Sequence, residues 1–420
     1  MKIKMKSKSY EEVMALPRPK HKKPMRPWFL LRTLVRVLSI PDLMRTKFRY
    51  TWVDKKTCPK GPYLILMNHS SFLDLKIASK IFYPMPYNIV STSDSLMGKA
   101  WLMRRIGCIP TEKFVSDMTL LRDMKYALLT KKRSVLMYPE AGYTFDGRSV
   151  TLPDSLGGLC KMLKVPVLMV TSHGAFHEQP LYNALRHRRV KVSAEVTCLL
   201  TPDEIEEKSQ EELNAAIHDA FSFDNFKWQK EEGIAIREMT RAEGLEKLLY
   251  RCPDCECEGH MTSCDDTLVC KACGHKFHLT EYGEIEALDG KTRFSHIPDW
   301  CDWERECVKD EIEAGQYSVS SKVRICMTVD YKSVYDVGQG SLLHNENGFV
   351  LSDESGKVLY EQKPLFSHSV CADLYWYERG DVIGIGPKGM THYCIFEEPW
   401  QVYKARLGAE ELYKKLRKRR

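Results

Sequence analysis

The first half of the chain contains short apolar runs separated by longer segments in which apolar residues recur every three or four positions. Short runs of this kind predict buried strands, and the longer segments predict helices. The predicted strands cover residues 63–67, 87–90, 134–138, 165–170 and 189–199. The predicted helices cover residues 72–82, 95–106, 118–130, 156–163 and 202–220. This alternation predicts an α/β fold, with a layered α/β domain over residues 50–225.

The second half of the chain has a different pattern, in which apolar and polar residues alternate one by one over residues 317–329. Asn347-Gly348 is a hairpin turn signal. Further short strands are expected around residues 358–360, 374–377, 382–385 and 392–396, followed by a helix over 400–416. We therefore predict a β-rich domain over residues 291–420 with one C-terminal helix. In architecture alone it resembles a pleckstrin-homology or GRAM-like β-barrel.

Two C-x-x-C pairs follow a charged connector predicted over residues 226–247. The pairs are Cys252/Cys255 and Cys270/Cys273, separated by fourteen residues. Two such pairs on a short hairpin frame place four thiolates tetrahedrally around a metal, so we predict a small zinc ribbon over residues 248–290 with a closed, structural zinc site. The alternative is a set of buried free cysteines. Cys257, Cys264 and His260 lie nearby but lack the pair spacing.

The 15 cysteines are an odd number, and the start of the chain lacks the apolar core of a secretory signal. Both observations argue against a disulfide framework and favour a reducing, cytoplasmic environment. No run of about 18 apolar residues occurs, so no membrane-spanning helix is expected.

Candidate chemistry begins at the end of the predicted strand 63–67. His69 follows this strand directly, and Asp74 comes five residues later. On one continuous helix their side chains would point about 140° apart, so they can meet only if Ser70-Ser71 forms a turn between them. A carboxylate on one ring nitrogen would leave the other nitrogen free as a general base. The alternative is a histidine and an aspartate without chemistry at a strand–helix junction.

Three later blocks accompany this pair: residues 107–113, residues 135–142 and the predicted strand 165–170. Together with residues 68–74 they resemble, in order and spacing, the glycerolipid acyltransferase family typified by 1-acylglycerol-3-phosphate acyltransferase. The family's blocks read roughly N-H-x-S-x-x-D, G-x-I-x-x-D-R, F-P-E-G-T-R and V-P-I-x-P-V. The resemblance covers about residues 50–223, a little under half of the chain.

The resemblance implies an acyl transfer from acyl-CoA or acyl-carrier protein to a hydroxyl of a phospholipid precursor. It implies His69 as general base and Asp74 as the group that orients it, with no covalent acyl-enzyme. Among the implied substrate-binding residues, Lys113 would bind phosphate and Glu140 would bind a glycerol hydroxyl or buttress the site; Gly142 lies in the same block as Glu140.

The chain also departs from the family pattern. Ala141-Gly142-Tyr143 stands where the family has Gly-Thr-Arg, and residues 91–94 read Ser-Thr-Ser-Asp where the family often has a lysine. Two cationic residues that the family usually uses to bind phosphate are therefore absent. Their absence argues against lysophosphatidic acid as the acceptor. Candidate substitutes are Arg104, Arg105 and Arg148.

Charge is distributed unevenly. Residues 1–50 contain 14 Lys/Arg and 3 Asp/Glu, whereas the formal net charge of the whole chain is +7, so the remainder is net acidic. We expect residues 1–49 to form a mobile basic arm, to about residue 25, followed by an amphipathic helix over 28–38. On this helix Arg32 and Arg36 share one face, and Trp28, Leu31, Leu34, Val35 and Leu38 share the other.

This arm and helix suit an anionic membrane surface, with the protein peripheral to the inner, cytoplasmic face of the membrane. The alternative is a helix packed on the protein's own core. A competing function is nucleic-acid binding through the ribbon and the basic termini, but the ribbon carries many acids that would repel phosphates. A third interpretation is a membrane scaffold with an idle acyltransferase fold.

Overall fold

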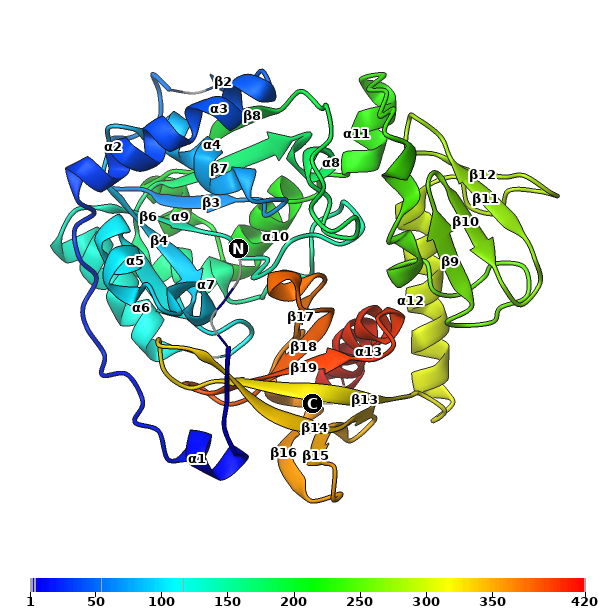
Figure 1. The fold of residues 1–420 in the computed structure, drawn as a ribbon. Coiled ribbons are helices and arrows are strands. Elements are labelled where there is room, and N and C mark those ends of the chain that lie inside the picture. Colours follow the sequence, from blue (N-terminus) through cyan, green and yellow to red (C-terminus); the bar gives the residue numbers. More distant parts are fainter. Residues whose placement is uncertain (1–2, 4, 54, 116, 419–420) are drawn as a thin grey trace.

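The computed structural model describes residues 3, 5–53, 55–115 and 117–418. The first half of the chain folds around a seven-stranded sheet in the order β2-β8-β7-β3-β6-β4-β5 (Figure 1). Strands β3 to β7 are mutually parallel, and β8 is antiparallel to β7. The strands are β2 (Arg49–Trp52), β3 (Leu64–Met67), β4 (Tyr87–Thr92), β5 (Cys108–Thr111), β6 (Ser134–Met137), β7 (Val167–His173) and β8 (Ser193–Leu200).

Helices cover both faces of this sheet, which confirms the predicted layered α/β domain. In β3, Leu64 and Leu66 pack into one core, whereas Ile65 and Met67 pack into the other. The helices are α2 (Phe29–Leu38), α3 (Ile40–Arg45), α4 (Leu73–Phe82), α5 (Ala100–Ile106), α6 (Met118–Lys125), α7 (Leu156–Leu163), α8 (Ala175–Glu178), α9 (Pro202–Glu207) and α10 (Gln210–Ala220). Because β3 is buried on both faces, every residue in it is apolar.

Two predicted helices are divided in the structure. The segment 95–106 splits into a 3-10 turn (Ser93–Leu96) and α5, because Gly98 adopts a φ of 70° between them. The segment 202–220 splits into α9 and α10, because Ser209 caps α10 by accepting a hydrogen bond from the backbone N–H of Glu212.

The cysteine-rich segment forms a four-stranded antiparallel sheet in the order β12-β11-β10-β9. Its strands are β9 (Met261–Cys264), β10 (Thr267–Cys270), β11 (Lys276–Leu279) and β12 (Ile285–Ala287). The preceding segment contains α11 (Asn225–Glu231) and buries Phe226, Leu245, Leu248 and Leu249. The charged connector is therefore packed against the protein.

The C-terminal part holds a curled antiparallel sheet in the order β16-β15-β14-β13-β19-β18-β17, on which α13 (Trp400–Lys418) packs (Figure 1). Among the described residues β16 and β17 remain unpaired edges, so the sheet is not closed into a barrel, and the pleckstrin-homology or GRAM-like architecture is not confirmed. The strands are β13 (Ser318–Thr328), β14 (Val334–Asn345), β15 (Gly348–Asp353), β16 (Val358–Gln362), β17 (Cys371–Asp373), β18 (Val382–Ile385) and β19 (Thr391–Phe396).

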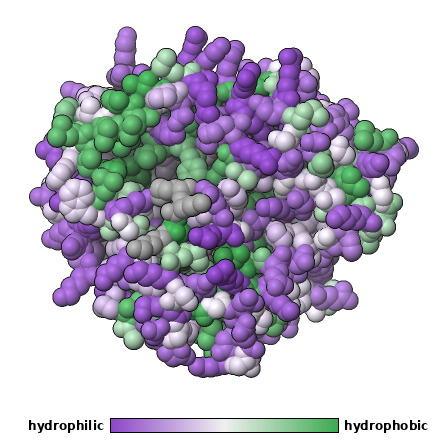
Figure 2. Space-filling model, viewed as in Figure 1, coloured by the Kyte–Doolittle hydropathy of each residue, from purple (hydrophilic) through white to green (hydrophobic). Residues whose placement is uncertain are grey.

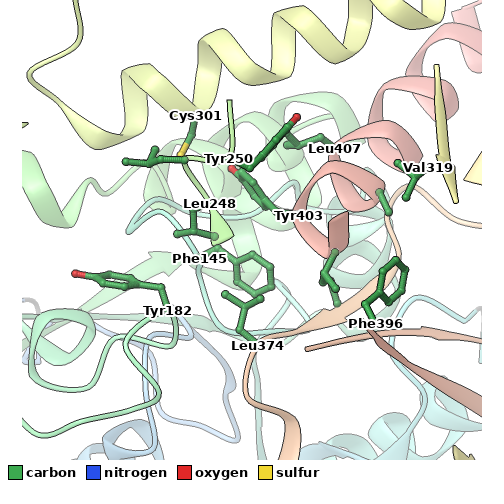
Figure 3. Packing of buried hydrophobic residues seen from close by; sticks show 14 of the residues in the cluster. Phe145, Tyr182, Leu248, Tyr250, Cys301, Val319, Leu374, Phe396, Tyr403 and Leu407 are labelled. Carbon is green, nitrogen blue, oxygen red and sulfur yellow. The ribbon is translucent and has the colours of Figure 1, made fainter. Parts of the chain in front are cut away.

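A long helix that the sequence analysis did not predict, α12 (Ile297–Glu313), connects the ribbon to this sheet. The ribbon, α12, α13 and the sheet share one continuous hydrophobic core, part of which Figure 3 shows. Phe145 of the α/β domain packs in the same core against Tyr403 of α13, with ring centroids 5.9 Å apart. The parts of the molecule are thus joined by packed apolar side chains.

The expectation of a mobile arm to about residue 25 is wrong for residues 5–14, whereas residues 1, 2 and 4 lie outside the described residues. Strand β1 (Met5–Ser7) pairs in parallel with β14, and α1 (Tyr10–Met14) follows it. The Tyr10 hydroxyl donates to the Leu359 carbonyl oxygen over 3.2 Å, and its ring stacks on His392. The beginning of the chain therefore completes the C-terminal sheet before the chain crosses to the α/β domain.

Candidate active site

His69 lies just beyond the carboxyl end of β3, the central strand of the α/β sheet, where functional groups of parallel sheets commonly collect. The residue before it fixes this position. The Asn68 side-chain oxygen accepts hydrogen bonds from the backbone N–H and the hydroxyl of Ser172, at 2.8 and 3.0 Å, and its amide donates to the Ser172 carbonyl. Asn68 thereby ties the end of β3 to β7, a role that the sequence analysis did not assign.

The predicted turn brings His69 and Asp74 into contact. His69 Nδ1 lies 2.8 Å from Asp74 Oδ2, and the same oxygen accepts from the backbone N–H groups of Ser70 and Ser71 at 2.8 and 3.1 Å. Asp74 is 1% exposed. An ionised carboxylate can only accept, so the ring proton belongs on Nδ1 and the lone pair on Nε2 is left for a substrate proton.

Two tyrosines hold the imidazole ring between them. Tyr138 stacks on His69 with centroids 4.1 Å apart and an interplanar angle of 22°, and Tyr143 lies at 4.2 Å and 40°. Burial, together with the negative charge of Asp74, raises the pKa of both phenols well above the usual value. They therefore remain neutral and fix the ring plane. In the sequence, Tyr143 stands out only as a departure from the family pattern.

Glu140 is 2% exposed and is fully engaged inside the protein. Its Oε2 accepts from the His69 backbone N–H at 2.6 Å, and its Oε1 accepts from the Ser149 hydroxyl at 2.9 Å and the Val150 backbone N–H at 3.2 Å. Burial raises its pKa to about 7 although these three donors favour the charged form. Of the two roles left open for Glu140, the contacts favour the buttress over direct substrate binding.

The loop that carries Glu140 and Tyr143 is held from the C-terminal half of the chain. Arg148 donates through both terminal nitrogens to Asp302 of α12, each over 2.7 Å, and also pairs with Asp146. The guanidinium of Arg406 on α13 lies 4.7 Å from the centroid of the Phe145 ring. Helices α12 and α13 therefore help to set the position of the loop behind His69.

A cavity of about 2170 Å³ opens in front of His69 and Asp74. This volume exceeds that of ordinary small-molecule pockets and suits a long-chain substrate. Apolar side chains along it include Phe72, Leu75, Met103, Met124 and Leu159. Lys113, which follows β5, also lines the cavity, and no hydrogen bond or ion pair of Lys113 occurs among the described residues. Ala141 and Tyr143 line it as well, whereas Gly142 does not belong to its wall.

The arginines proposed to replace the missing family cations are engaged elsewhere. Arg104 donates to the carbonyl oxygens of Lys22 and Lys23, and the Arg105 guanidinium lies over the Trp101 ring at 3.9 Å. Arg148 is held by Asp146 and Asp302, as described above. None of the three lines the cavity. The structure therefore does not support the possibility that one of these arginines replaces the missing phosphate-binding cations.

The four cysteines with paired spacing come together at one end of the ribbon. Their Sγ atoms all lie within 4.8 Å of one another, with Cys252 and Cys273 at 3.8 Å and Cys255 and Cys270 at 3.6 Å. Two thiolates on one tetrahedral zinc are about 3.8 Å apart when each Zn–S bond is about 2.3 Å. The cluster therefore fits a tetrahedral metal ion. Within the described part of the chain, Cys257, Cys264 and His260 are not members of it.

The sheet, the histidine–carboxylate pair at its carboxyl edge and the large cavity beside the pair define the class of the domain as α/β with a candidate acid–base site. Residues 49–173 match the protein-family model described as Acyltransferase, and this segment is an acyltransferase domain. The match covers the strand β3, the His69–Asp74 pair, Lys113 and Glu140.

Comparison with solved structures finds the 1-acyl-sn-glycerophosphate (LPA) acyltransferase PlsC from Thermotoga maritima. The two chains are 16% identical, with a TM-score of 0.36, over 45% of this chain and 76% of that one. No curated protein matches the chain significantly.

Proposed function

We propose that the protein transfers a fatty acyl group from acyl-CoA or acyl-carrier protein to a hydroxyl of a phospholipid precursor. The observation that supports this most is the 2.8 Å contact between His69 and Asp74, both of which line a cavity of about 2170 Å³. The acyltransferase domain match over residues 49–173 supports the reaction class.

In this mechanism Nε2 of His69 removes the proton of the acceptor hydroxyl as its oxygen attacks the thioester carbonyl. Formation of the new C–O bond gives a tetrahedral intermediate. Its collapse breaks the C–S bond and releases the thiolate. The thiolate then takes the proton from the imidazolium of His69. Asp74 stabilises the imidazolium and keeps the ring oriented, while Tyr138 and Tyr143 keep its plane fixed. The charges and atoms balance without a covalent acyl-enzyme.

We further propose that the four-cysteine cluster holds zinc in a structural role. Four protein thiolates fill a tetrahedral coordination shell and leave no open position for a substrate or water. When bound, the metal would fix the two cysteine turns to each other. The Lys404 ammonium of α13 donates to Glu258 of the ribbon, and Tyr250 stacks on Trp400. The ribbon would therefore stabilise the helix that packs behind the active-site loop.

We propose, finally, that the protein acts at an anionic membrane surface. In the described part of the chain, no helix has the length and apolar character needed to cross a bilayer. Figure 2 shows apolar surface at the upper left, where α2 lies in Figure 1. Exposed apolar side chains of α2 and α3 are Phe29, Leu30, Leu34, Val37, Leu38, Ile40 and Met44, and α5 adds Trp101 and Leu102. We call this set the apolar face.

The expected distribution of α2 side chains is partly wrong, because Arg32 points toward the protein, where its Nη1 donates to the Pro84 carbonyl oxygen. Of the expected apolar face, Leu34 and Leu38 are exposed, whereas Leu31 and Val35 are half-buried. The exposed side chains support membrane insertion, since no core within the described residues covers them. Exposed Lys20, Lys22 and Lys23 precede the helix and supply cations for lipid head groups.

The test is acyl transfer by purified protein from acyl-CoA and from acyl-carrier protein to lysophospholipids presented in vesicles. His69→Ala should lower the rate at least about 100-fold, the scale of a lost general base, while the protein keeps its melting temperature. Equal rates for the wild type and His69→Ala, or no transfer from either donor, would refute the proposal and leave the scaffold interpretation.

A further inference from the structure

The C-terminal sheet domain forms one wall of the cavity that contains His69. Its contribution consists of residues 365–368, 373–378, 413–414 and 417–418. These residues lie on the turn before β17, on β17 with the segment after it, and at the end of α13. The acyltransferase domain therefore does not enclose the site alone, and a substrate at His69 would also meet groups from the second domain.

Two carboxylates from different domains face this shared cavity. Asp94 follows β4 in the acyltransferase domain, and Asp373 ends β17 in the C-terminal domain; both line the cavity. Asp94 is only 7% exposed, and its Oδ1 has no hydrogen-bond partner among the described residues. A buried carboxylate oxygen without a donor is costly, so a donor on a bound molecule would stabilise it.

The second carboxylate belongs to Asp373, whose backbone pairs with Val382 in the sheet. Its side chain makes no hydrogen bond or ion pair within the described part of the chain. Burial raises the pKa of Asp373 to about 6, with Asp94 adding to the effect and Lys113 opposing it. Tyr143, which packs on His69, is within electrostatic range of both Asp94 and Asp373. The acidic pair is therefore close to the catalytic histidine.

The same part of the cavity holds the Lys113 ammonium. Burial opposes the charge of Lys113, but the acidic groups around it, Asp373 and Asp94 among them, raise its pKa overall. Most other cations along the cavity wall are already paired: Lys76 with Asp42, Arg417 with Asp154, and Lys414 with Glu411. The pocket thus presents the Lys113 ammonium beside two carboxylates, one of which, Asp94, also interacts with the Tyr377 hydroxyl and with Lys99.

We propose, on the basis of the acyl transfer inferred above, that this pocket binds the headgroup of a zwitterionic lysophospholipid. Lys113 would bind its phosphodiester, and Asp94 and Asp373 would accept hydrogen bonds from its protonated amine. Such a headgroup carries one negative charge, opposite in sign to the Lys113 ammonium, and one positive charge, opposite in sign to the two carboxylates. A phosphomonoester headgroup, such as that of 1-acylglycerol-3-phosphate, carries nearly two negative charges. It has no ammonium group that could donate hydrogen bonds to the two carboxylates, so it matches the pocket poorly.

The experiment compares lysophosphatidylethanolamine with lysophosphatidylglycerol, two acceptors that share the phosphodiester and differ in the amine, and adds 1-acylglycerol-3-phosphate. The quantity measured is kcat/KM in mixed vesicles with the thioester donor that the wild type uses. We expect the amine to increase kcat/KM about 10-fold or more over the glycerol headgroup, the scale of a charged hydrogen bond inside a protein.

Asp373→Asn should reduce about 10-fold the ratio between the two kcat/KM values, lysophosphatidylethanolamine over lysophosphatidylglycerol, and Asp94→Asn should act in the same direction. Glu361→Gln, an exposed acid on β16 of the same domain, is the matched control and should change neither value. A preference for 1-acylglycerol-3-phosphate or lysophosphatidylglycerol, or a preference for the amine that survives in both Asp variants, would overturn the inference while leaving acyl transfer intact. Absence of transfer to every acceptor would instead refute the proposed function.

Discussion

Glu140 holds the main chain of His69 through a hydrogen bond of 2.6 Å from the His69 N–H to its Oε2. The carbonyl oxygen of His69 accepts from the backbone N–H of Thr144 at 3.0 Å, in the same loop. The loop after β6 therefore fixes both backbone polar groups of the candidate general base. The Asp74 contact orients the ring, whereas Glu140 positions the residue.

Glu140→Gln tests this positioning role. All the groups that bind the Glu140 carboxylate are donors, and two of them are backbone N–H groups that cannot reverse. The glutamine amide would therefore place an N–H against a backbone N–H, with a cost of about 1–3 kcal/mol in the free energy of unfolding and a loss of activity. Chemical denaturation and acyl transfer measure the two effects. Ser149→Ala, which removes one donor only, is the control and should cost about 1 kcal/mol; equal losses in both variants would contradict the argument.

The pH dependence of stability follows from the same group. The pKa of Glu140 is raised to about 7 in the folded protein, compared with 4.5 for an ordinary glutamate. The folded state therefore binds more protons than the unfolded state between these values, so the contribution of Glu140 to the free energy of unfolding decreases as pH rises from about 4.5 to 7. The free energy of unfolding, measured by chemical denaturation, should therefore depend differently on pH in the wild type and in Glu140→Gln across this range. The same pH dependence in both proteins would contradict the raised pKa of Glu140.

Asp74→Asn should lower kcat about 100-fold or more with little change in melting temperature. The amide oxygen can still accept from the turn N–H groups, but it does not carry the charge that stabilises an imidazolium at His69. Ser71→Ala is a matched control in the same turn, since the Ser71 hydroxyl only accepts from the backbone N–H of Leu73, at 3.2 Å. We expect less than about a 10-fold loss for it. Similar losses in both variants would mean that Asp74 acts only through the turn.

The sequence identified what depends on local spacing and missed what depends on the path of the chain. The His69–Asp74 contact was predictable because a turn must join two residues five apart, and the four cysteines were predictable because their spacing matches a metal site. Tyr138 and Tyr143 meet His69 only because the loop after β6 folds back over β3, which no spacing indicates. The pairing of β1 with β14 could not be predicted, because the short basic sequence of β1 has the composition of a solvent-exposed arm.

Helix α12 is a different case, because its signal was present. Ile297, Trp300, Cys301, Glu304 and Val308 recur at helical spacing and are all buried. The alternating pattern of the strands after residue 317 is the stronger signal within residues 291–420, and the prediction for this range therefore contained no helix before the strands. The closeness of Asp94 and Asp373 could not be predicted, since it depends on how two domains pack.

Cys273→Ser should lose the metal and lower both melting temperature and activity. The ribbon core is continuous with α12 and α13, and these helices contact the loop that holds Glu140. The test measures the metal content, the melting temperature and the acyl-transfer rate on one sample of the purified variant. It shows whether loss of the metal is accompanied by losses of stability and activity. Cys264→Ser is the control, because Cys264 is exposed and lies outside the four-cysteine group. Full activity in a metal-free Cys273→Ser protein would show that the ribbon is an independent module.

Membrane binding should depend on the exposed apolar side chains of α2. The test of this prediction should use point substitutions, not a deletion of the first residues of the chain. A deletion of residues 1–40 would also remove β1 and so expose β14, which confuses loss of binding with loss of folding. The double variant Leu30→Ser/Leu34→Ser avoids this problem, since the two side chains are 76% and 50% exposed and support no core.

Each leucine that enters the interface contributes roughly 1.5–3 kcal/mol when fully buried, so the double variant should bind anionic vesicles at least about 10-fold more weakly. The lysines before the helix add an attraction that salt screens over about 10 Å at 0.1 M. High salt should therefore weaken wild-type binding without abolishing it, whereas high salt should abolish binding of the double variant. Met239→Ser, an exposed apolar residue outside the apolar face, is the control and should bind like wild type. Undiminished binding of the double variant in vesicle flotation would place the membrane contact elsewhere on the molecule.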